Sequence, residues 1–565
     1  IAQGKAIAGV LGDGDGGNTA CCEGVQVFRN DGVAQMDICC IFWEEACKPP
    51  TGTWAMAAFY VSADKAYAVA LGPGQDLYDE SAWSVSFDDG DTWNQLSLID
   101  TWIDYFSDVA KSPDCNKTFL VSVNEDPIED GDGDCYCDSV WLYGDDLPEY
   151  GYSEYSEHWI RTWCGILDSD WGLLRLNPEE TTGDTVYLVD YGTSTVYWSE
   201  LEGLDCWNRG GSSVDEIVDL AVLDKETIFA LGDDGMVAMS DDYAIGWHEE
   251  ENSEVANGYT IAVWGDWILV GSTNGEVSYS DDGGETFDLL EEIPTIDGWV
   301  TVAFDTYFDT NHVVYAATDE DDYTGGIYSW VIGESEEWTD LKAEPLESQI
   351  GVDDGDLVDE TIELAYTGLV VDRPGNPFTS ADNGGVIYAS YVGYWGGYYF
   401  TGVARSLERE VTICMTCLTW DFLQEGLTVD VEMFYTYPDA LKICGCLTPD
   451  SNTHLFAIDE WWDYDICEGE DGAVWTFEDC YAKSAPEITF PADGTVIPAD
   501  PCSCFSVPFT VIWDSMCDAC SYDIAFALDE EFDMPVSVNQ LEDMTYHLEE
   551  QDVPTFSVLG GPDGG

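Results

Sequence analysis

One short hydrophobic pattern recurs along most of the 565-residue chain. In each copy, small or β-branched residues surround one aromatic or large aliphatic residue, and Gly or Asp turn residues and another short hydrophobic run follow. The eight copies centre on Tyr67, Phe119, Tyr187, Phe229, Ile268, Tyr315, Tyr388 and Phe456. Their average spacing of about 56 residues is typical of propellers and other repeat arrays. Because no convincing amphipathic helix interrupts them, the sequence predicts an all-β chain with a seven- or eight-bladed β-propeller over residues 51–483.

A turn motif, Ser-x-Asp-x-Gly-x-Thr followed by an aromatic residue, occurs twice between these copies. In such a hairpin the Asp side chain caps the turn and Gly takes the position with φ above zero. A decayed copy begins at Ser240 and ends at Trp247. The two full copies consist of Ser86, Asp88, Gly90, Thr92 and Trp93, and of Ser280, Asp282, Gly284, Thr286 and Phe287. The motif resembles the Asp-box, or BNR repeat, of sialidase-like and sortilin-like β-propellers, where it is structural and lies away from the binding face.

The segments that flank the repeats differ from them. Residues 1–50 are rich in cysteine and are predicted to form an arm that supplies a closing strand to the last blade. Residues 484–560 show the alternation of a small β-sandwich, with Trp513 as its single tryptophan. This segment resembles the fibronectin type III or Ig-like modules that are appended to bacterial and archaeal surface proteins.

The 20 cysteines predict disulfides rather than a zinc site, because only five histidines accompany them and no ligand spacing is apparent. Their even number fits complete pairing, but their connectivity stays open. The candidates are Cys21, Cys22, Cys39, Cys40, Cys47, Cys115, Cys135, Cys137, Cys164, Cys206, Cys414, Cys417, Cys444, Cys446, Cys467, Cys480, Cys502, Cys504, Cys517 and Cys520. With a chain that begins at Ile1, we expect a removed secretory signal and an extracellular location. No run of 18 apolar residues predicts a membrane span.

The formal net charge of −98 limits the partners of the chain. It argues against binding to nucleic acid and to anionic lipid. It leaves cations, glycans, other surface proteins and further copies of the chain. Three Asp-Gly loops predict Ca²⁺ binding, because Gly permits tight turns in which carboxylates converge on one cation; solvated acidic turns are the alternative for each loop. The candidate ligands are Asp13 and Asp15, then Asp130, Asp132 and Asp134, and then Asp353, Asp354 and Asp356.

The sequence leaves the question of enzymatic activity open and argues more against an enzyme than for one. A sialidase needs an arginine cluster, and the seven arginines here lack the expected sequence context, while the acidic surface would repel an anionic sugar. A hydrolase of neutral glycans needs two carboxylates and stays open as an alternative. One aromatic segment could stack against sugars, although packing against a neighbouring blade is the preferred interpretation. That segment contains Tyr391, Tyr394, Trp395, Tyr398, Tyr399 and Phe400.

These observations together predict a secreted, self-assembling structural subunit of a microbial cell surface, such as an S-layer, sheath or extracellular filament. The polyanionic subunits are expected to be bridged by cations. The alternative is a β-propeller that binds or hydrolyses a neutral glycan. A third interpretation takes the acidic composition as halophilic adaptation, but the 20 cysteines and the aromatic content of 13% fit that less well.

Overall fold

The computed structural model describes the strands and many of their connections, and it divides the chain into two compact units. The first unit holds residues 1–375, 379–448 and 454–477, and the second holds residues 376–378, 449–453 and 478–565. The described residues are 6–9, 27–30, 44–50, 54–60, 65–71, 82–88, 90–96, 103, 105–124, 138–144, 147, 155, 158–169, 171–291, 293, 298–319, 325–343, 363–372, 385–395, 398–406, 420–423, 441–445, 453–458, 474–479, 488–490, 509–513, 522–526, 536–541 and 545–548.

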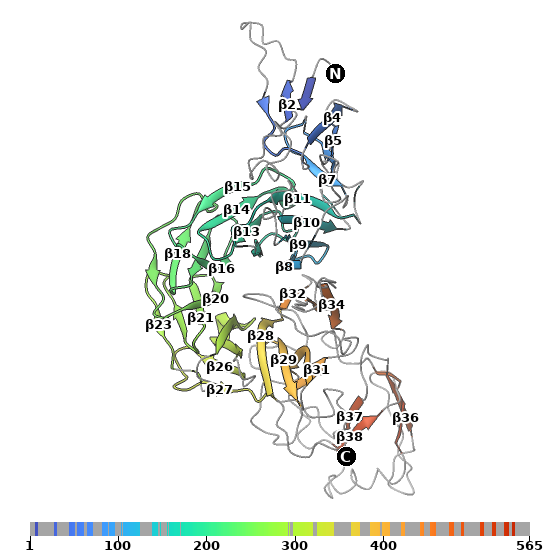
Figure 1. Ribbon diagram of the computed structural model, residues 1–565. Helices are drawn as coiled ribbons and strands as arrows, with labels where there is room; N and C mark the ends of the chain where they lie inside the picture. Colours follow the sequence, from blue (N-terminus) through green and yellow to red (C-terminus); the bar gives the residue numbers. More distant parts are fainter. Residues whose placement is uncertain are drawn as a thin grey trace, which may run out of the picture. The chain divides into compact units, whose positions relative to one another are not determined.

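The strands that the structure describes in the first unit form an all-β propeller with six four-stranded antiparallel blades, which follow one another along the chain (Figure 1). The first two blades are β8(Tyr105–Lys111), β9(Lys117–Val123), β10(Asp138–Gly144) and β11(Ile160–Gly165), and then β12(Gly172–Leu176), β13(Val186–Asp190), β14(Thr195–Ser199) and β15(Asn208–Gly211). The next two are β16(Ile217–Val222), β17(Ile228–Gly232), β18(Met236–Ser240) and β19(Glu251–Asn252), and then β20(Gly258–Trp264), β21(Trp267–Ser272), β22(Val277–Ser280) and β23(Asp288–Leu289). The last two are β24(Trp299–Phe304), β25(Val313–Asp319), β26(Ile327–Val331) and β27(Thr339–Asp340), and then β28(Glu363–Val371), β29(Ile387–Trp395), β30(Tyr398–Ser406) and β31(Trp420–Leu423).

The inner strands of these blades follow one another around the ring. Each inner strand from β8 to β28 contacts the inner strand of the next blade. After β28 comes a three-stranded sheet of β32(Leu441–Gly445), β33(Thr453–Ile458) and β34(Val474–Asp479), and its strand β32 contacts both β28 and β8. Phe456 of this sheet packs with Val109, Leu120 and Trp141 of the first blade. The last sheet of the propeller therefore lies against the first blade.

The blade number differs from the seven or eight that the sequence predicted, although all eight copies of the hydrophobic pattern form the second strand of a sheet. The copy at Tyr67 lies in β5, within the strands β4(Trp54–Tyr60), β5(Ala66–Leu71), β6(Ala82–Ser86) and β7(Asn94–Leu96). Strand β7 pairs with β11, so these four strands extend the outer edge of the first blade. The copy at Phe456 lies in the three-stranded sheet. Six copies remain for the four-stranded blades.

The repeated aromatic residue forms the core between neighbouring blades. Phe119, Tyr187, Tyr315 and Tyr388 occupy this position in four blades, and each side chain is fully buried. The hydroxyl group of Tyr187 donates to the carbonyl of Lys225, and that of Tyr315 donates to Asp305 Oδ2 at 2.7 Å. Burying such rings is the main source of stability in a sheet that packs on both faces. The period in the sequence is thus the period of the core.

The remaining described strands form smaller sheets. Residues 1–50 contribute β1(Ala6–Gly9), β2(Val27–Asn30) and β3(Glu44–Glu45), which pair with one another in a three-stranded sheet. The second unit holds a sheet of β35(Ile488–Phe490), β36(Phe509–Trp513) and β39(Thr545–Leu548), and a hairpin of β37(Tyr522–Phe526) and β38(Val536–Leu541). The described ranges contain the short helix α1(Phe308–Asn311), the 3₁₀ turn Leu201–Gly203 and the 3₁₀ residue Tyr155. None of the described helical segments has the length and apolar character needed to cross a membrane.

Candidate functional site

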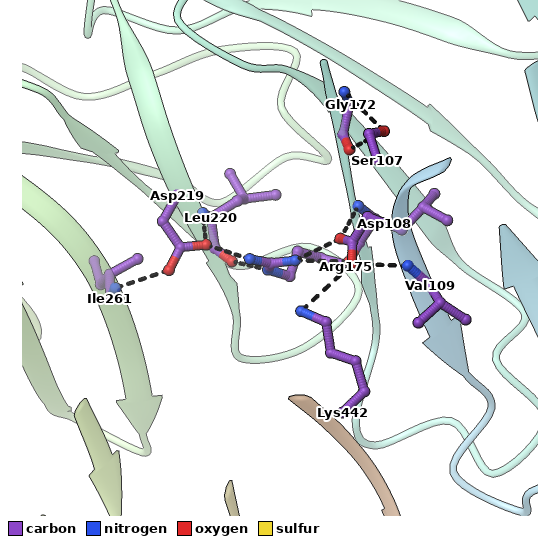
Figure 2. A network of polar contacts seen from close by, with 10 residues as sticks. Ser107, Asp108, Val109, Gly172, Arg175, Asp219, Leu220, Ile261 and Lys442 are labelled. Atoms are coloured by element: carbon purple, nitrogen blue, oxygen red, sulfur yellow. Dashed lines mark hydrogen bonds and ion pairs between the residues drawn. The ribbon is translucent and has the colours of Figure 1, made fainter. Parts of the chain in front are cut away.

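A network of charged residues joins the inner strands of the propeller (Figure 2). Asp108 lies on β8, Arg175 on β12, Asp219 on β16 and Lys442 on β32. The pairing register of β8 and of β16 shifts immediately before the aspartate, between Phe106 and Asp108 in β8. A β-bulge re-aims the side chain that follows it, and here it turns an aspartate toward the neighbouring blade.

Asp108 is almost fully buried, and both of its carboxylate oxygens have several donors. Oδ1 accepts from the backbone N–H of Val109 at 2.8 Å and lies 3.6 Å from Lys442 Nζ. Oδ2 accepts from the backbone N–H of Leu174 at 2.8 Å and from Arg175 Nη1 at 3.1 Å. One carboxylate thus connects the first blade to the second blade and to the last sheet.

Arg175 lies between the two aspartates (Figure 2). Its Nη2 donates to Asp219 Oδ1 at 2.5 Å, and its Nε donates to the carbonyl of Leu220 at 3.0 Å. Asp219 in turn accepts from the backbone N–H of Leu220 at 2.7 Å and from that of Ile261, on β20, at 2.9 Å. The network therefore runs from the first blade to the fourth.

Hydroxyl groups make comparable links between blades. Ser107 Oγ donates to the carbonyl of Gly172 at 2.8 Å and accepts from its N–H at 3.2 Å (Figure 2). Thr260 Oγ1 donates to the carbonyl of Val300 at 2.8 Å and accepts from the N–H of Val302 at 3.3 Å. These hydroxyl groups satisfy backbone atoms of β12 and β24, which are edge strands with a ladder partner on one side only. These contacts fasten blades to one another. Arg175 and backbone N–H groups already neutralise or bind the carboxylates of this network, which an acid–base mechanism would need.

The two predicted Ser-x-Asp-x-Gly-x-Thr turns have the same hydrogen bonds. In the first turn, Ser86 Oγ donates to Asp88 Oδ1 at 2.7 Å, and Thr92 Oγ1 donates to Asp88 Oδ2 at 2.6 Å. Gly90 has a φ of 89°, and its N–H donates to Ser86 Oγ at 2.8 Å. Trp93 is 2% exposed, and its Nε1 donates to the carbonyl of Gly90 at 3.1 Å.

The second turn repeats this geometry between β22 and β23. The distances are 2.8 Å from Ser280 Oγ to Asp282 Oδ1 and 2.7 Å from Thr286 Oγ1 to Asp282 Oδ2. Gly284 again has a φ of 89°, and Phe287 is buried. These hydrogen bonds lower the pKa of Asp282, because Thr286 donates to its charged form. Each Asp is held by its own hairpin, which makes it a structural residue.

The decayed copy shows how the turn tolerates change. Ala244 replaces the glycine and adopts a φ of 64°, and its N–H donates to Ser240 Oγ at 3.0 Å. Trp247 Nε1 donates to the carbonyl of Ala244 at 3.2 Å, as Trp93 does in the first turn. The hydrogen bonds are thus retained although an L-residue stands in a left-handed conformation, which costs about 1–2 kcal/mol.

The structure places some of the predicted cysteines. Cys47 and Cys206 form a disulfide that joins residues 159 positions apart, with a Cα–Cα distance of 5.8 Å. Cys115 is also disulfide-bonded. Cys164 is half-buried on β11, and Cys444 lies on β32. The remaining cysteine candidates lie outside the described residues.

The predicted Ca²⁺ loops cannot be compared with the structure in the same way. All eight aspartates, from Asp13 to Asp356, lie outside the described residues. Within the part of the chain that the structure describes, no cluster of three or more metal-ligating side chains occurs. Calcium binding therefore stays a prediction that depends on those loops.

The aromatic segment of the predicted sugar platform forms the hairpin of β29 and β30. Trp395 is paired with Tyr398 at its tip. Tyr391 is fully buried, and its ring lies 5.4 Å from that of Phe422. Tyr391 therefore belongs to the core. The side chains of Tyr394, Trp395, Tyr398, Tyr399 and Phe400 lie outside the described part of the structure.

Sequence reasoning did not single out Asp108, Arg175 or Asp219. A signal was present, since Arg175 and Asp219 are each the single charged residue of an otherwise apolar inner strand. Asp108 likewise directly precedes two apolar residues, Val109 and Ala110. A charge in such a run must be paired when it is buried. The partner on another blade could not be identified, because the repeat does not say which strands are neighbours around a ring.

No protein-family model and no curated protein matches the sequence. Among solved structures, U3-55K is similar over 68% of this chain and 98% of its own, with 9% identity and a TM-score of 0.41. YCF48 from Cyanidioschyzon merolae is similar over 64% of this chain and 95% of its own, with 10% identity and a TM-score of 0.38. The WD40 repeats of RRP9 are similar over 54% of this chain and 79% of their own, with 10% identity and a TM-score of 0.35. The β-propeller assignment rests on the strand order and the inner-strand contacts of the chain itself.

Proposed function

We propose that this protein is a secreted structural subunit that assembles with copies of itself into a microbial surface layer, sheath or extracellular filament. The observation that carries the proposal is the use of charge in the ring. Buried Asp108 and Asp219 share Arg175 and bind backbone N–H groups of neighbouring blades. Such a network holds a rigid scaffold together and leaves no carboxylate pair of this site for chemistry.

The disulfide between Cys47 and Cys206 supports an extracellular location, because disulfides persist in oxidising compartments. We further propose that the Ser-x-Asp-x-Gly-x-Thr turns are Asp boxes and that residues 484–560 form a fibronectin type III or Ig-like module. Such modules suit a subunit that links to neighbours.

Assembly of subunits with a net charge of −98 requires counterions. Like charges on two copies repel each other, and this repulsion weakens with added salt. A divalent cation shared by carboxylates of two copies reverses the repulsion where the subunits meet. We therefore propose Ca²⁺ as the bridging cation.

The experiment is negative-stain electron microscopy and analytical ultracentrifugation of the purified protein. The samples contain Ca²⁺, a chelator, or monovalent salt of matched ionic strength. The proposal expects sheets or filaments with Ca²⁺ and smaller species with chelator. A protein that stays monomeric in all three buffers and that binds or cleaves a neutral polysaccharide would overturn it in favour of the glycan-directed alternative.

A further inference from the structure

Lys48 anchors the segment 44–50 to the first and second blades. Its Nζ lies 2.8 Å from Asn94 Oδ1, on β7. Three backbone carbonyl oxygens also lie within hydrogen-bond distance of Nζ, those of Thr162 at 3.2 Å, Gly203 at 2.9 Å and Leu204 at 2.9 Å. The amine is thus held against one side-chain amide by acceptors from two separate parts of the chain.

The amide of Asn94 is equally fixed. Asn94 is fully buried, and its Nδ2 donates to the carbonyl of Leu204 at 3.1 Å. The backbone holds the two residues in register, since Lys48 N–H donates to the carbonyl of Asp91 at 3.1 Å and Trp93 N–H donates to the carbonyl of Lys48 at 3.0 Å. A reactive amine and a carbonyl that are held in this way need little further ordering before they react.

Burial shifts Lys48 toward the neutral amine, which is the nucleophilic form. Burial lowers the pKa of Lys48 to about 7, although the negative charges of Asp205 and Asp88 act in the opposite direction. A substantial fraction of Lys48 is therefore unprotonated near neutral pH. A desolvated lysine of this kind is an activated nucleophile.

We propose that Lys48 and Asn94 form an intramolecular isopeptide bond. The lone pair of Nζ attacks Cγ of Asn94, and the carbonyl electrons move to Oδ1 in a tetrahedral intermediate. The Cγ–Nδ2 bond then breaks, a proton from Nζ passes to Nδ2, and ammonia leaves. The product is a secondary amide whose one remaining N–H can still donate to a neighbouring carbonyl. No oxidant, reductant or further reactant is needed.

The bond would give segment 44–50 two adjacent covalent attachments. Cys47 is already joined to Cys206, and the isopeptide bond would join the next residue, Lys48, to β7. Unlike the disulfide, the isopeptide bond would survive reduction. The two links together would hold this segment on the propeller under load, and the isopeptide bond alone would keep it attached under reducing conditions.

The sequence offers a direct test on the full-length protein. Met36, Met56 and Met236 are consecutive methionines, so cyanogen bromide produces the fragments 37–56 and 57–236. The first fragment contains Lys48 and the second contains Asn94. After reduction and alkylation of the cysteines, the proposal expects these fragments to remain joined. It also expects the intact reduced protein to weigh less than its sequence by one ammonia, with the Lys48–Asn94 link found by tandem mass spectrometry.

Two variants sharpen the test. Lys48→Arg keeps a positive charge but cannot form the bond, so its fragments should separate and its mass should equal that of its sequence. The matched control is Lys117→Arg, because buried Lys117 pairs with a carboxylate, Glu202 at 3.1 Å; its fragments should stay joined. Separate fragments and an unchanged mass in the wild-type protein would overturn the proposal, whether or not the variants fold. Loss of ammonia with separate fragments would indicate a succinimide at one of the asparagines and would overturn it too.

Discussion

Replacing Arg175 by methionine tests whether the inner-strand network stabilises the ring. Arg175 is the cation between Asp108 and Asp219, at 3.1 Å and 2.5 Å from their oxygens. The exposed fractions of the two carboxylate side chains are 2% and 1%. Arg175→Met keeps much of the apolar stem but removes the guanidinium that neutralises both carboxylates.

The expected cost follows from burial of those charges. Removing one partner of a buried ion pair destabilises a protein by about 3–5 kcal/mol, because the remaining charge stays desolvated. Asp108 retains Lys442 at 3.6 Å, while Asp219 retains the backbone N–H groups of Leu220 and Ile261. Since some compensation remains at each aspartate, we expect the cost to lie toward the lower end, about 3 kcal/mol.

Urea denaturation of four proteins measures this effect: wild type, Arg175→Met, Asp219→Asn and the double variant. Arg175→Met leaves the buried charge of Asp219 without its cation, and Asp219→Asn removes that charge. The double variant should therefore be more stable than the sum of the single effects predicts, by about 1–3 kcal/mol. The control is Arg209→Met, since Arg209 is exposed and makes one hydrogen bond, to Thr195 at 3.2 Å; it should cost less than about 1 kcal/mol. Additive single effects, or equal costs for Arg175→Met and Arg209→Met, would refute the reasoning.

Three further outcomes are expected. Burial raises the pKa of Glu202 from 4.5 to about 7, so the protonated carboxyl contributes stability that is complete below pH 4.5 and is lost as the pH rises through 7. The free energy of unfolding should fall by up to about 3 kcal/mol across this range. Denaturation at a series of pH values should show this fall in wild type but not in Glu202→Gln. Gly210→Ala should lower the stability by about 1–3 kcal/mol, because a Cβ at this position would lie 2.0 Å from the Ala244 carbonyl oxygen. Gly211→Ala should be nearly neutral, because a Cβ at that position would have no atom within 4 Å. Equal melting temperatures of the two variants would contradict this. Calcium at about 100 times its Kd should raise the stability by about 2.7 kcal/mol, and a melting temperature that chelator leaves unchanged relative to monovalent salt would argue against specific binding.

The fold was predictable to the level of the repeat and no further. Each copy of the pattern, from Tyr67 to Phe456, forms the second strand of a sheet, because the position of its large side chain is the position of the core. The blade number of seven or eight was wrong, because β5 has the same alternation as a blade strand although its sheet pairs edge to edge with β11 through β7. Local pattern sets which face of a strand is buried, but it does not set whether the sheet faces the ring or extends a blade.

The turns and the inner-strand network differ in whether their hydrogen-bond partners are close together in the sequence. Ser86, Asp88 and Thr92 lie within one hairpin, so the local sequence was enough to predict that Asp88 caps the turn, although not that Ser86 and Thr92 donate to it. Asp108 and Arg175 lie on different blades, and their partnership depends on the bulge in β8 that turns the aspartate. A bulge leaves no clear mark in a single sequence, and neither does the order of the blades around the ring.

The contacts of β32 with β8 also affect how the chain completes its fold. Lys442 and Phe456 belong to the last sheet, while Asp108 and Lys111 belong to the first strand of the first blade, and Lys111 Nζ lies 4.6 Å from the ring of Phe456. During synthesis the edge formed by β8 must therefore wait for almost the whole propeller to be made before its neighbour exists. Contacts this distant in sequence form slowly, and an uncovered edge can meanwhile accept the same strand from another molecule. Refolding at high protein concentration should therefore produce dimers with exchanged last sheets, and dilution during refolding should suppress them.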